Sequence, residues 1–390
     1  MKIIHCADLH LDSRMTSNLS PDKAKERKNE ILNTFVNMVD YASAHEVDAI
    51  IIAGDMFDTS NISALTRNTV ERTIRSHKDI EFYYLLGNHD RDNFLSGLDS
   101  IPDNLFLFKD SFITYNPKGN QNITITGIEL NSENNNGVAN GLILSPSRFN
   151  IVTMHGQESV SMGRDKTQIV NIRELKNKNI DYLALGHIHY YKEEKLDEGG
   201  VYCYSGCLEG RGFDEPGDHG FVLITIDEEK KTSVREFVKF AARDMVILSC
   251  DITDCMTTME VIDRIDDSIA ASLVRSRDLV KIVLKGQTDV EAERDVNYIV
   301  KHYEDRFYFV KVYDESSLKI NIDDYLMDMS LKGEYVRRIM AATDISEEDY
   351  PAVVPGLPKG AYHVYDYQFF YRNLQKNVKV RLEQYLENAA

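Results

Sequence analysis

The amino-acid sequence predicts an α/β protein: a four-layer α/β/β/α sandwich, followed by a small α+β domain and a helical tail. Short apolar runs rich in Val and Ile alternate with longer helical patterns early in the chain, as strands of a parallel sheet do. Later strand-like runs are joined by connections too short for a helix, which adds antiparallel pairs. A length of 390 residues exceeds one ordinary hydrophobic core. We therefore expect a large domain at 1–243, a small domain at 244–315 and a tail at 316–390.

The elements of the large domain follow from hydrophobic periodicity and capping residues. A long helix is predicted from Asp22 to Glu46, because its apolar residues fall on one face and Ser20 and Pro21 suit its start. A second helix is predicted at Ser63–His77. The predicted strands are Lys2–Ala7, Ala49–Ala53, Phe82–Leu86, Asn122–Ile128, Asn150–Met154, Tyr182–Leu185, Val201–Tyr204, Phe221–Ile226 and Val234–Phe240.

A different pattern begins after Asp244, where strands and helices alternate as a compact βαβαβ unit. The tail has two helical stretches on either side of an aromatic segment at 362–371, which either packs on the small domain or binds a partner. The predicted strands of the small domain are Met245–Asp251, Leu279–Leu284 and Phe307–Val312, its helices are Thr257–Ser272 and Asp289–Tyr303, and the tail helices are Ile322–Thr343 and Asn377–Asn388.

The composition excludes several classes of protein. With 43% hydrophobic and 28% charged residues the chain is globular rather than disordered, and no run approaches the ~18 apolar residues of a membrane span. The first strand begins at Lys2, which leaves no room for a signal peptide. The five cysteines lack zinc-finger spacing, so we expect buried thiols in a reducing cytoplasm. A net charge of −18 argues against tight autonomous DNA binding and favours a partner that supplies basic surface.

Five short segments end in metal-binding side chains, and four of them directly follow an apolar run. The carboxyl ends of parallel strands meet at one edge of a sheet, so these side chains are expected to converge. Two carboxylates, one amide and four imidazoles suffice for two divalent cations, and cations about 3.5–4 Å apart suit in-line cleavage of phosphate esters. The segments are Asp8-Leu9-His10, Gly54-Asp55, Gly87-Asn88-His89-Asp90, Met154-His155-Gly156 and Gly186-His187-Ile188-His189.

Each segment alone also has an ordinary structural explanation. An Asp after a strand often caps the next helix, and a lone His is often a hydrogen-bonded core residue. Their conjunction is different, because five of the eleven histidines fall within these segments. Alternation along an extended segment would place His187 and His189 on the same side, so that both reach one metal centre. The sequence therefore predicts a two-metal phosphoesterase.

The order of these motifs resembles the calcineurin-like metallophosphoesterase superfamily, over Asp8 to His189. The resemblance implies that Asp55 bridges the two ions and that His89 protonates the leaving oxygen or stabilises the transition state, with Asp90 orienting His89. Mixed N and O ligands suit Mn²⁺ best, with Mg²⁺, Fe or Zn²⁺ as alternatives, and the attacking hydroxide would be activated by the cations. The implied ligands are Asp8, His10 and His189 for one ion and Asn88, His155 and His187 for the other.

Two further segments resemble the SbcD and Mre-type nuclease family: Ile3 to Asp12, and the loop from Ser205 to Gly217. Beyond residue 217 the resemblance rests on layout. In that family the small domain caps the active site and contacts DNA, and the tail binds an SMC-like ATPase of the SbcC type. A homodimer is also implied. Candidate substrate contacts in this chain are Arg211, Arg164 and Lys166 for phosphate and Phe213 for a base.

The leading functional hypothesis is a metal-dependent DNA nuclease acting on double strands as an exonuclease and on single strands as an endonuclease. It would be the D-type subunit of an SbcCD-like DNA repair and recombination complex in the cytoplasm. One alternative is a metallophosphoesterase acting on small phosphodiesters or phosphoproteins. Another is a mainly structural assembly subunit, against which the complete set of expected ligands argues.

Overall fold

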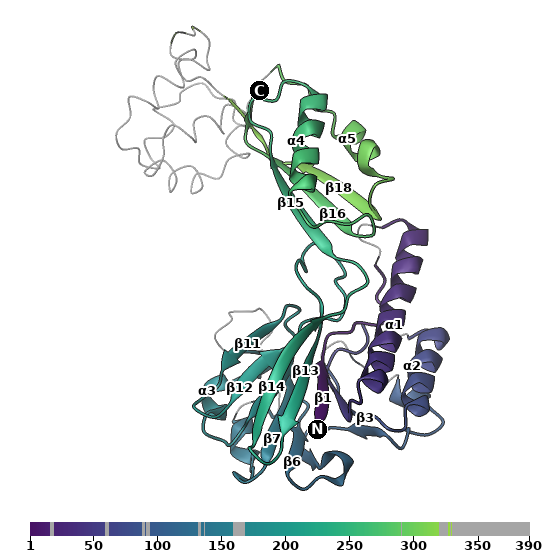
Figure 1. Cartoon of the computed structure of the whole chain (residues 1–390), viewed down its shortest axis with the longest axis vertical. Helices are drawn as coiled ribbons and strands as arrows, with labels where there is room; N and C mark the ends of the chain where they lie inside the picture. The colour runs from purple at the N-terminus through teal and green to yellow at the C-terminus, as the bar shows by residue number, and fades with distance from the viewer. Residues whose placement is uncertain are drawn as a thin grey trace, which may run out of the picture. The chain divides into compact units, whose positions relative to one another are not determined.

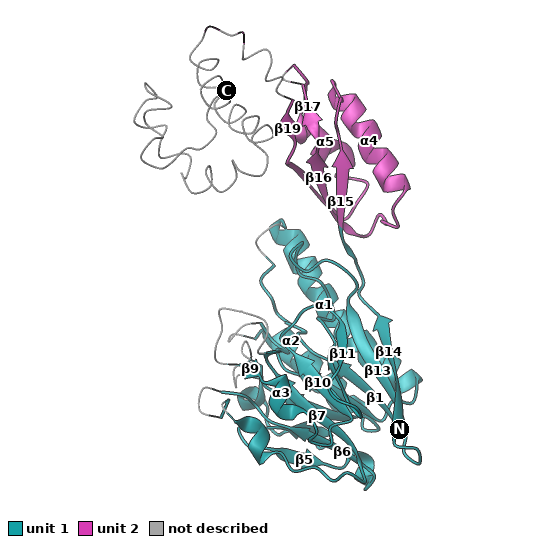
Figure 2. Cartoon of the chain, turned by 90° about the vertical axis from the view of Figure 1, so that its left-hand side faces the viewer, with its two compact units in different colours: residues 1–246 teal, residues 247–390 magenta. Residues whose placement is uncertain are grey.

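The structure is a computed structural model that describes residues 1–15, 19–58, 62–87, 90, 94–131, 134–135, 137–158, 168–289, 291–319, 327 and 329. The chain divides into two compact units, Met1–Val246 and Ile247–Ala390 (Figure 2). The three-part division at 243 and 315 stays a prediction. Both predicted tail helices, apart from residues 327 and 329, and the whole aromatic segment at 362–371 lie outside the described residues.

The first unit contains two six-stranded sheets. In the first sheet the order is β14-β13-β1-β2-β3-β4, where β1 to β4 are parallel and the β13–β14 hairpin adds antiparallel strands beside β1. Figure 1 shows β14, β13 and β1 side by side. Its strands are β1 (Lys2–Cys6), β2 (Ala49–Ala53), β3 (Glu81–Leu85), β4 (Leu105–Leu107), β13 (Gly220–Asp227) and β14 (Thr232–Lys239).

The second sheet has the order β11-β12-β10-β7-β6-β5. Strands β6, β7, β10 and β12 are parallel, whereas β5 and β11 pair antiparallel at the two edges. The strands are β5 (Ile113–Tyr115), β6 (Ile123–Gly127), β7 (Phe149–His155), β10 (Tyr182–Gly186), β11 (Lys192–Lys195) and β12 (Val201–Tyr204); a separate short pair is β8 (Gln157–Glu158) with β9 (Ile169–Val170).

Helices α1 (Pro21–Ala44) and α2 (Ala64–Ser76) form the outer layer on the first sheet. The side chains of Ser20 and Ser63 accept hydrogen bonds from the Lys23 and Thr66 amides, which fixes where each helix begins. Apolar clusters fill the spaces between these helices and the first sheet, between the two sheets, and outside the second sheet. The predicted α/β sandwich is confirmed, although the last layer contains only short helices such as α3 (Ile172–Leu175).

The second unit has a three-stranded sheet in the order β15-β16-β18. The predicted alternation of strands and helices is present, but the second helix begins at Val296 rather than Asp289 as predicted. The cause is local, because the Asp295 side chain accepts a hydrogen bond from the Tyr298 amide and caps the helix there. The elements are β15 (Met245–Asp251), α4 (Thr258–Ala270), β16 (Leu279–Lys285), α5 (Val296–Tyr303) and β18 (Phe309–Asp314), with a small β17 (Gln287–Thr288) and β19 (Ser317–Leu318) pair.

Two features of the described residues relate to the expectations drawn from the composition. All five cysteines are buried and unpaired, as the sequence predicted. No helix in the described part of the chain is both long and apolar enough to cross a membrane.

Candidate metal centre

The centre is built at the carboxyl ends of parallel strands. Asp8 follows β1 and Asp55 follows β2, and the Asp8 amide donates a hydrogen bond to the Gly54 carbonyl at 3.1 Å. Both Asp residues have a left-handed φ of 51°. Non-glycine residues rarely adopt this conformation, and it recurs where function requires a sharp turn. The two carboxylates are thereby brought to one edge of the first sheet.

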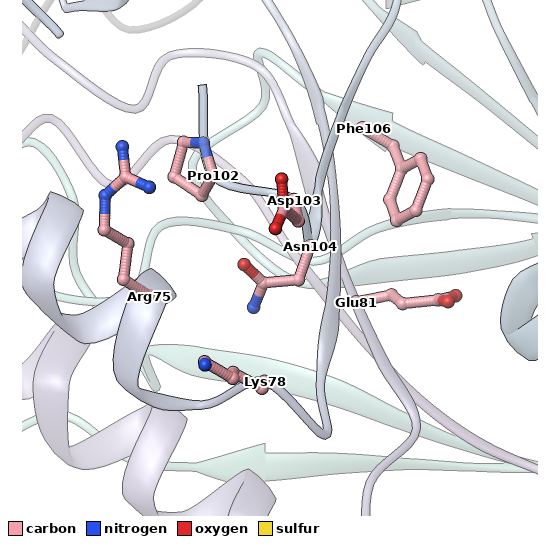
Figure 3. A pocket seen from close by; sticks show the side chains of 7 residues that line it. All are labelled: Arg75, Lys78, Glu81, Pro102, Asp103, Asn104 and Phe106. Atoms are coloured by element: carbon pink, nitrogen blue, oxygen red, sulfur yellow. The ribbon is translucent and has the colours of Figure 1, made fainter. Parts of the chain in front are cut away.

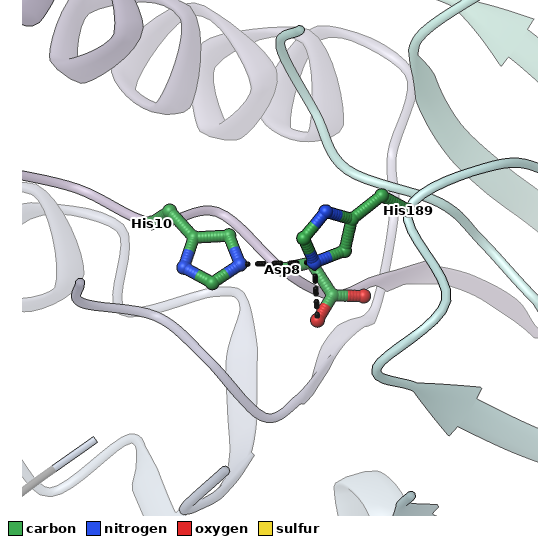
Figure 4. A group of neighbouring side chains, drawn as sticks. All are labelled: Asp8, His10 and His189. Carbon is green, nitrogen blue, oxygen red and sulfur yellow. Dashed lines mark hydrogen bonds and ion pairs between the residues drawn. The ribbon is translucent and has the colours of Figure 1, made fainter. Parts of the chain in front are cut away.

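One group of side chains consists of Asp8, His10 and His189, whose donor atoms all lie within 4.8 Å of one another (Figure 4). The Nε2 atoms of the two histidines are 3.2 Å apart, and His189 Nε2 lies 4.0 Å from Asp8 Oδ1. The Asp8 and His10 side chains are fully buried, whereas 28% of the His189 side chain is exposed. The group therefore joins residues from both sheets and opens to solvent at His189.

A second group consists of Asp8, Asp55 and His155, again with all donor atoms within 4.8 Å. Asp55 Oδ2 lies 3.4 Å from His155 Nε2 and 3.9 Å from His10 Nε2. His155 Nδ1 lies 2.9 Å from the Ala53 carbonyl, which holds the ring so that Nε2 faces the carboxylates. Asp55 thus lies between a histidine of each group, as a bridging carboxylate must.

His187 occupies the same edge, but it adopts a different conformation from the predicted one. Strand β10 ends at Gly186 and His187 has a φ of 98°, so the alternation of an extended segment does not apply. Its amide donates to both carboxylate oxygens of Asp8 at 3.0 Å, and its ring lies 5.4 Å from the His155 ring. The turn directs His187 toward His155 and leaves His189 beside His10.

The electrostatics of the centre favour cations. Burial, together with the neighbouring Asp55 carboxylate, raises the pKa of Asp8 to about 7. Burial alone would lower the pKa of His155, but Asp55 and Asp8 raise it to about 9. Two buried carboxylates side by side, surrounded by imidazoles, are poorly stabilised by each other and well stabilised by a positive ion. The donor set therefore fits divalent metal ions.

Two glycines allow the chain segments at this edge to pack closely. A Cβ atom on Gly87 would lie 2.2 Å from Asp55 Oδ1, and one on Gly186 would lie 2.0 Å from the Ala53 carbonyl oxygen. Real Cβ atoms do not come this close, so any larger residue would displace the ligands. Gly87 and Gly186 are therefore required at these strand ends for steric reasons.

Asp90 holds the backbone around the centre. Its buried carboxylate accepts hydrogen bonds from the amides of Met56, Phe57 and Gly87, at 3.1, 2.8 and 3.0 Å. These bonds tie the loop after β2 to the end of β3. Asn88 and His89, which complete this motif, lie outside the described residues. The expected effect of Asp90 on His89 stays a prediction.

The region that carries these residues matches a known family. Residues 1–191 fit the family model described as calcineurin-like phosphoesterase. This match assigns residues 1–191, just under half of the chain, to a calcineurin-like phosphoesterase domain. The acid–histidine groups described above lie within this matched region.

Relatives extend the similarity beyond this domain. The chain is 28% identical to the metallophosphoesterase YhaO of Bacillus subtilis, over 58% of this chain and 57% of YhaO. It is 23% identical to the DNA double-strand break repair protein Mre11 of Sulfolobus acidocaldarius, over 93% of this chain and 99% of that protein. A shorter match, 32% identical, covers 23% of this chain and 21% of the D-type subunit of the SbcCD nuclease of Escherichia coli. The matched region thus spans little more than half of YhaO.

The candidate substrate contacts of the phosphoesterase domain are only partly described. Arg164 and Lys166 lie outside the described residues, and Phe213 is half-buried on the loop after β12. Arg211 directs its guanidinium to Glu215 and Asp58, at 2.8 and 3.1 Å. Substrate contact by these four residues stays a prediction.

Two carboxylates that the sequence did not predict lie beside the candidate metal-binding histidines. Glu215 lies 2.7 Å from His189 Nδ1, and Asp58 Oδ1 lies 3.2 Å from His10 Nδ1. Burial would raise the pKa of Glu215, but His189 and Arg211 hold it well below its usual range. The available signals were the second Asp three residues after Asp55 and the three acidic residues of the Ser205–Gly217 loop, neither specific by itself.

The phosphoesterase domain also has a surface hollow of about 470 Å³ far along the sheet from these ligands (Figure 3). It lies where β3 and β4 begin, at the opposite strand ends. Asn104 there donates to the carbonyls of Ile74, His77 and Ile80 and so caps the end of α2. These polar contacts of the hollow stabilise the fold. Neither candidate metal-binding group lines the hollow. The lining residues are Arg75, Lys78, Glu81, Pro102, Asp103, Asn104 and Phe106.

Proposed function

We propose that this chain is a metal-dependent DNA nuclease, the D-type subunit of an SbcCD-like repair complex. The observation that carries the proposal is the pair of largely buried acid–histidine groups sharing Asp8 at the strand ends of a phosphoesterase domain. The choice of DNA as substrate is supported by relatives named as a break-repair protein and a nuclease subunit, one of which aligns over 93% of this chain.

The proposed ligands fall into two sets. Asp8, His10 and His189 would hold one ion, and His155, His187 and Asn88 the other. Asp55 would contact both ions, a role supported by its position between His10 and His155. Mn²⁺ is the metal that we propose for both sites, because nitrogen and oxygen donors are mixed around a shared carboxylate.

The proposed reaction is hydrolysis of a phosphodiester, in which the cations and His89 have different roles. When bound, the two cations would neutralise the phosphate and supply an activated water for in-line attack. His89 would give its proton to the leaving oxygen, and Asp90 would orient it by holding the backbone of the same loop. Arg211, Arg164, Lys166 and Phe213 are the proposed contacts to the rest of the DNA.

The proposed partners follow from the same relatives and from charge. A chain with a net charge of −18 gains little from long-range attraction to DNA, so an SMC-like ATPase of the SbcC type would supply basic surface. The residues after 315 are the proposed ATPase-binding segment and 244–315 the DNA-contacting cap. A homodimer in the cytoplasm completes the proposal.

The direct test is Mn²⁺-dependent cleavage of linear duplex and single-stranded DNA by the purified chain, alone and with its ATPase, beside His89→Ala. A small chromogenic phosphodiester is assayed in parallel. We expect His89→Ala to lose about 10²–10⁴-fold in DNA cleavage while still binding Mn²⁺. Turnover of the small ester without any DNA cleavage, even with the ATPase present, would contradict the nuclease assignment.

A further inference from the structure

We propose that Asp58, Arg211 and Glu215 form a clamp that positions His10 and His189 and so sets the affinity of one metal position. This inference rests on the metal site of the proposed function. It concerns residues outside the expected ligand set, and it gives Arg211 a positioning role beside the metal in addition to its proposed contact with DNA.

The clamp begins behind His189. The ring has Nε2 facing Asp8 and His10, while Nδ1 lies 2.7 Å from Glu215 Oε1. A carboxylate behind the distal nitrogen of a metal-binding imidazole fixes the ring, selects the tautomer and strengthens the donor nitrogen. Because 28% of the His189 side chain is exposed, the surrounding packing alone does not hold this ring.

The same arrangement recurs behind His10, which comes from a different segment. Its Nε2 atom faces His189 and Asp55, and its Nδ1 atom lies 3.2 Å from Asp58 Oδ1. Asp58 is itself held by Ser13, whose hydroxyl donates to Oδ2 at 2.9 Å. Two histidines of the same proposed metal position are therefore each backed by a carboxylate.

One arginine joins the two carboxylates. Arg211 donates to Glu215 Oε1 through Nη2 at 2.8 Å and through Nε at 3.3 Å, and to Asp58 Oδ1 through Nη1 at 3.1 Å. Its backbone amide also donates to Glu215 Oε2 at 2.8 Å. The planar guanidinium suits this double role, because its donors are fixed relative to one another. The positive charge of Arg211 offsets the repulsion between the two carboxylates. The net charge of Asp58, Arg211 and Glu215 together is one negative.

The other proposed metal position is backed differently. His155 Nδ1 lies against the backbone carbonyl of Ala53, a neutral acceptor, at 2.9 Å. A charged partner raises the basicity of an imidazole more than a neutral one. The clamp therefore makes the Asp8–His10–His189 position the tighter of the two, to be filled first as Mn²⁺ is added.

The test measures Mn²⁺ binding by isothermal titration calorimetry on the purified full chain, without DNA. The variants are Glu215→Gln, Asp58→Asn and Arg211→Gln, each compared with Arg235→Gln. Arg235 on β14 forms an ion pair with Glu193 on β11 and serves as the matched control. We expect the tighter of two binding steps to weaken about 10–100-fold in the three clamp variants and to be unchanged in the control.

Opposite results overturn the clamp. If Arg211 served only substrate phosphate, removing its positive charge would leave Mn²⁺ affinity unchanged or increase it. The same conclusion follows if Glu215→Gln binds Mn²⁺ as the parent does. Thermal unfolding of each metal-free variant shows whether it is folded, and the comparison is made with the clamp variants that are folded. Because no DNA is present, tight two-step Mn²⁺ binding with altered variants supports the clamp even if nuclease activity is never found.

Discussion

The guanidinium of Arg27 is completely buried against the carboxylate of Glu209, with Nη2 2.5 Å from Oε2. Arg27 lies on α1, and Glu209 lies on the loop that also carries Arg211 and Glu215. The other Glu209 oxygen accepts hydrogen bonds from Thr34 Oγ1 and the Ala242 amide, at 2.7 and 2.6 Å. Each charged group therefore has a buried partner of opposite charge, and the pair fixes this loop against the helix.

Replacing Arg27 by Met should destabilise the first unit by about 3–5 kcal/mol, because Glu209 would keep a buried charge with no cation beside it. Urea unfolding of the full chain measures the change. The control is Arg75→Gln, which removes a partly exposed pair with Glu71 and should cost about 1 kcal/mol or less. Equal effects from the two variants would mean that the Arg27 pair does not fix the loop.

Replacing Gly87 by Ala should weaken Mn²⁺ binding about 10–100-fold, because the added Cβ would meet Asp55 Oδ1 and displace that carboxylate. Gly141→Ala is the matched control, since its Cβ would have only ordinary contact with Phe112 at 3.6 Å. Mn²⁺ titration of both metal-free proteins gives the comparison. Parent-like affinity in the Gly87 variant would show that Asp55 does not bind the metal at this position.

The stability of the metal-free protein should respond to the charge on Glu129. This side chain accepts a hydrogen bond from the Leu86 amide, and burial raises its pKa from 4.5 to about 7. A raised carboxyl pKa adds stability that is complete below pH 4.5 and is lost as pH rises through 7.

Glu129→Gln should therefore unfold like the parent at pH 4 and be more stable at pH 8. The side chain is only half-buried, so solvent screening reduces the gain to about 1 kcal/mol. Thermal unfolding in the presence of a chelator measures it. A difference of the same size at both pH values would contradict the assignment.

Much of this site was predictable from the sequence, because the end of a buried strand can be located from a short stretch of residues. Asp8, Asp55 and His155 follow apolar runs, and parallel pairing brings such ends together. The clamp was not predictable in the same way. Asp58 and Glu215 are separated by more than 150 residues, and only the tertiary fold brings their carboxylates to one guanidinium.

The predicted and observed secondary structures differ for local reasons. Strand β11 reads Lys-Glu-Glu-Lys, so no apolar alternation marks it, and it forms only by pairing with β12 at the sheet edge. Helix α5 was predicted too long because its apolar periodicity begins before its cap at Asp295. The conformation of His187 depends on its positive φ, which the residue type at this position does not predict.

The central claim is that this edge of the sandwich holds two cations on either side of Asp55. Equilibrium dialysis against Mn²⁺, with the bound metal counted per chain, tests it most directly for the parent and for Asp55→Asn. We predict two ions per chain in the parent and loss of at least one in the variant. A parent that binds one ion or none, or a variant that still binds two, would contradict a two-metal centre bridged by Asp55.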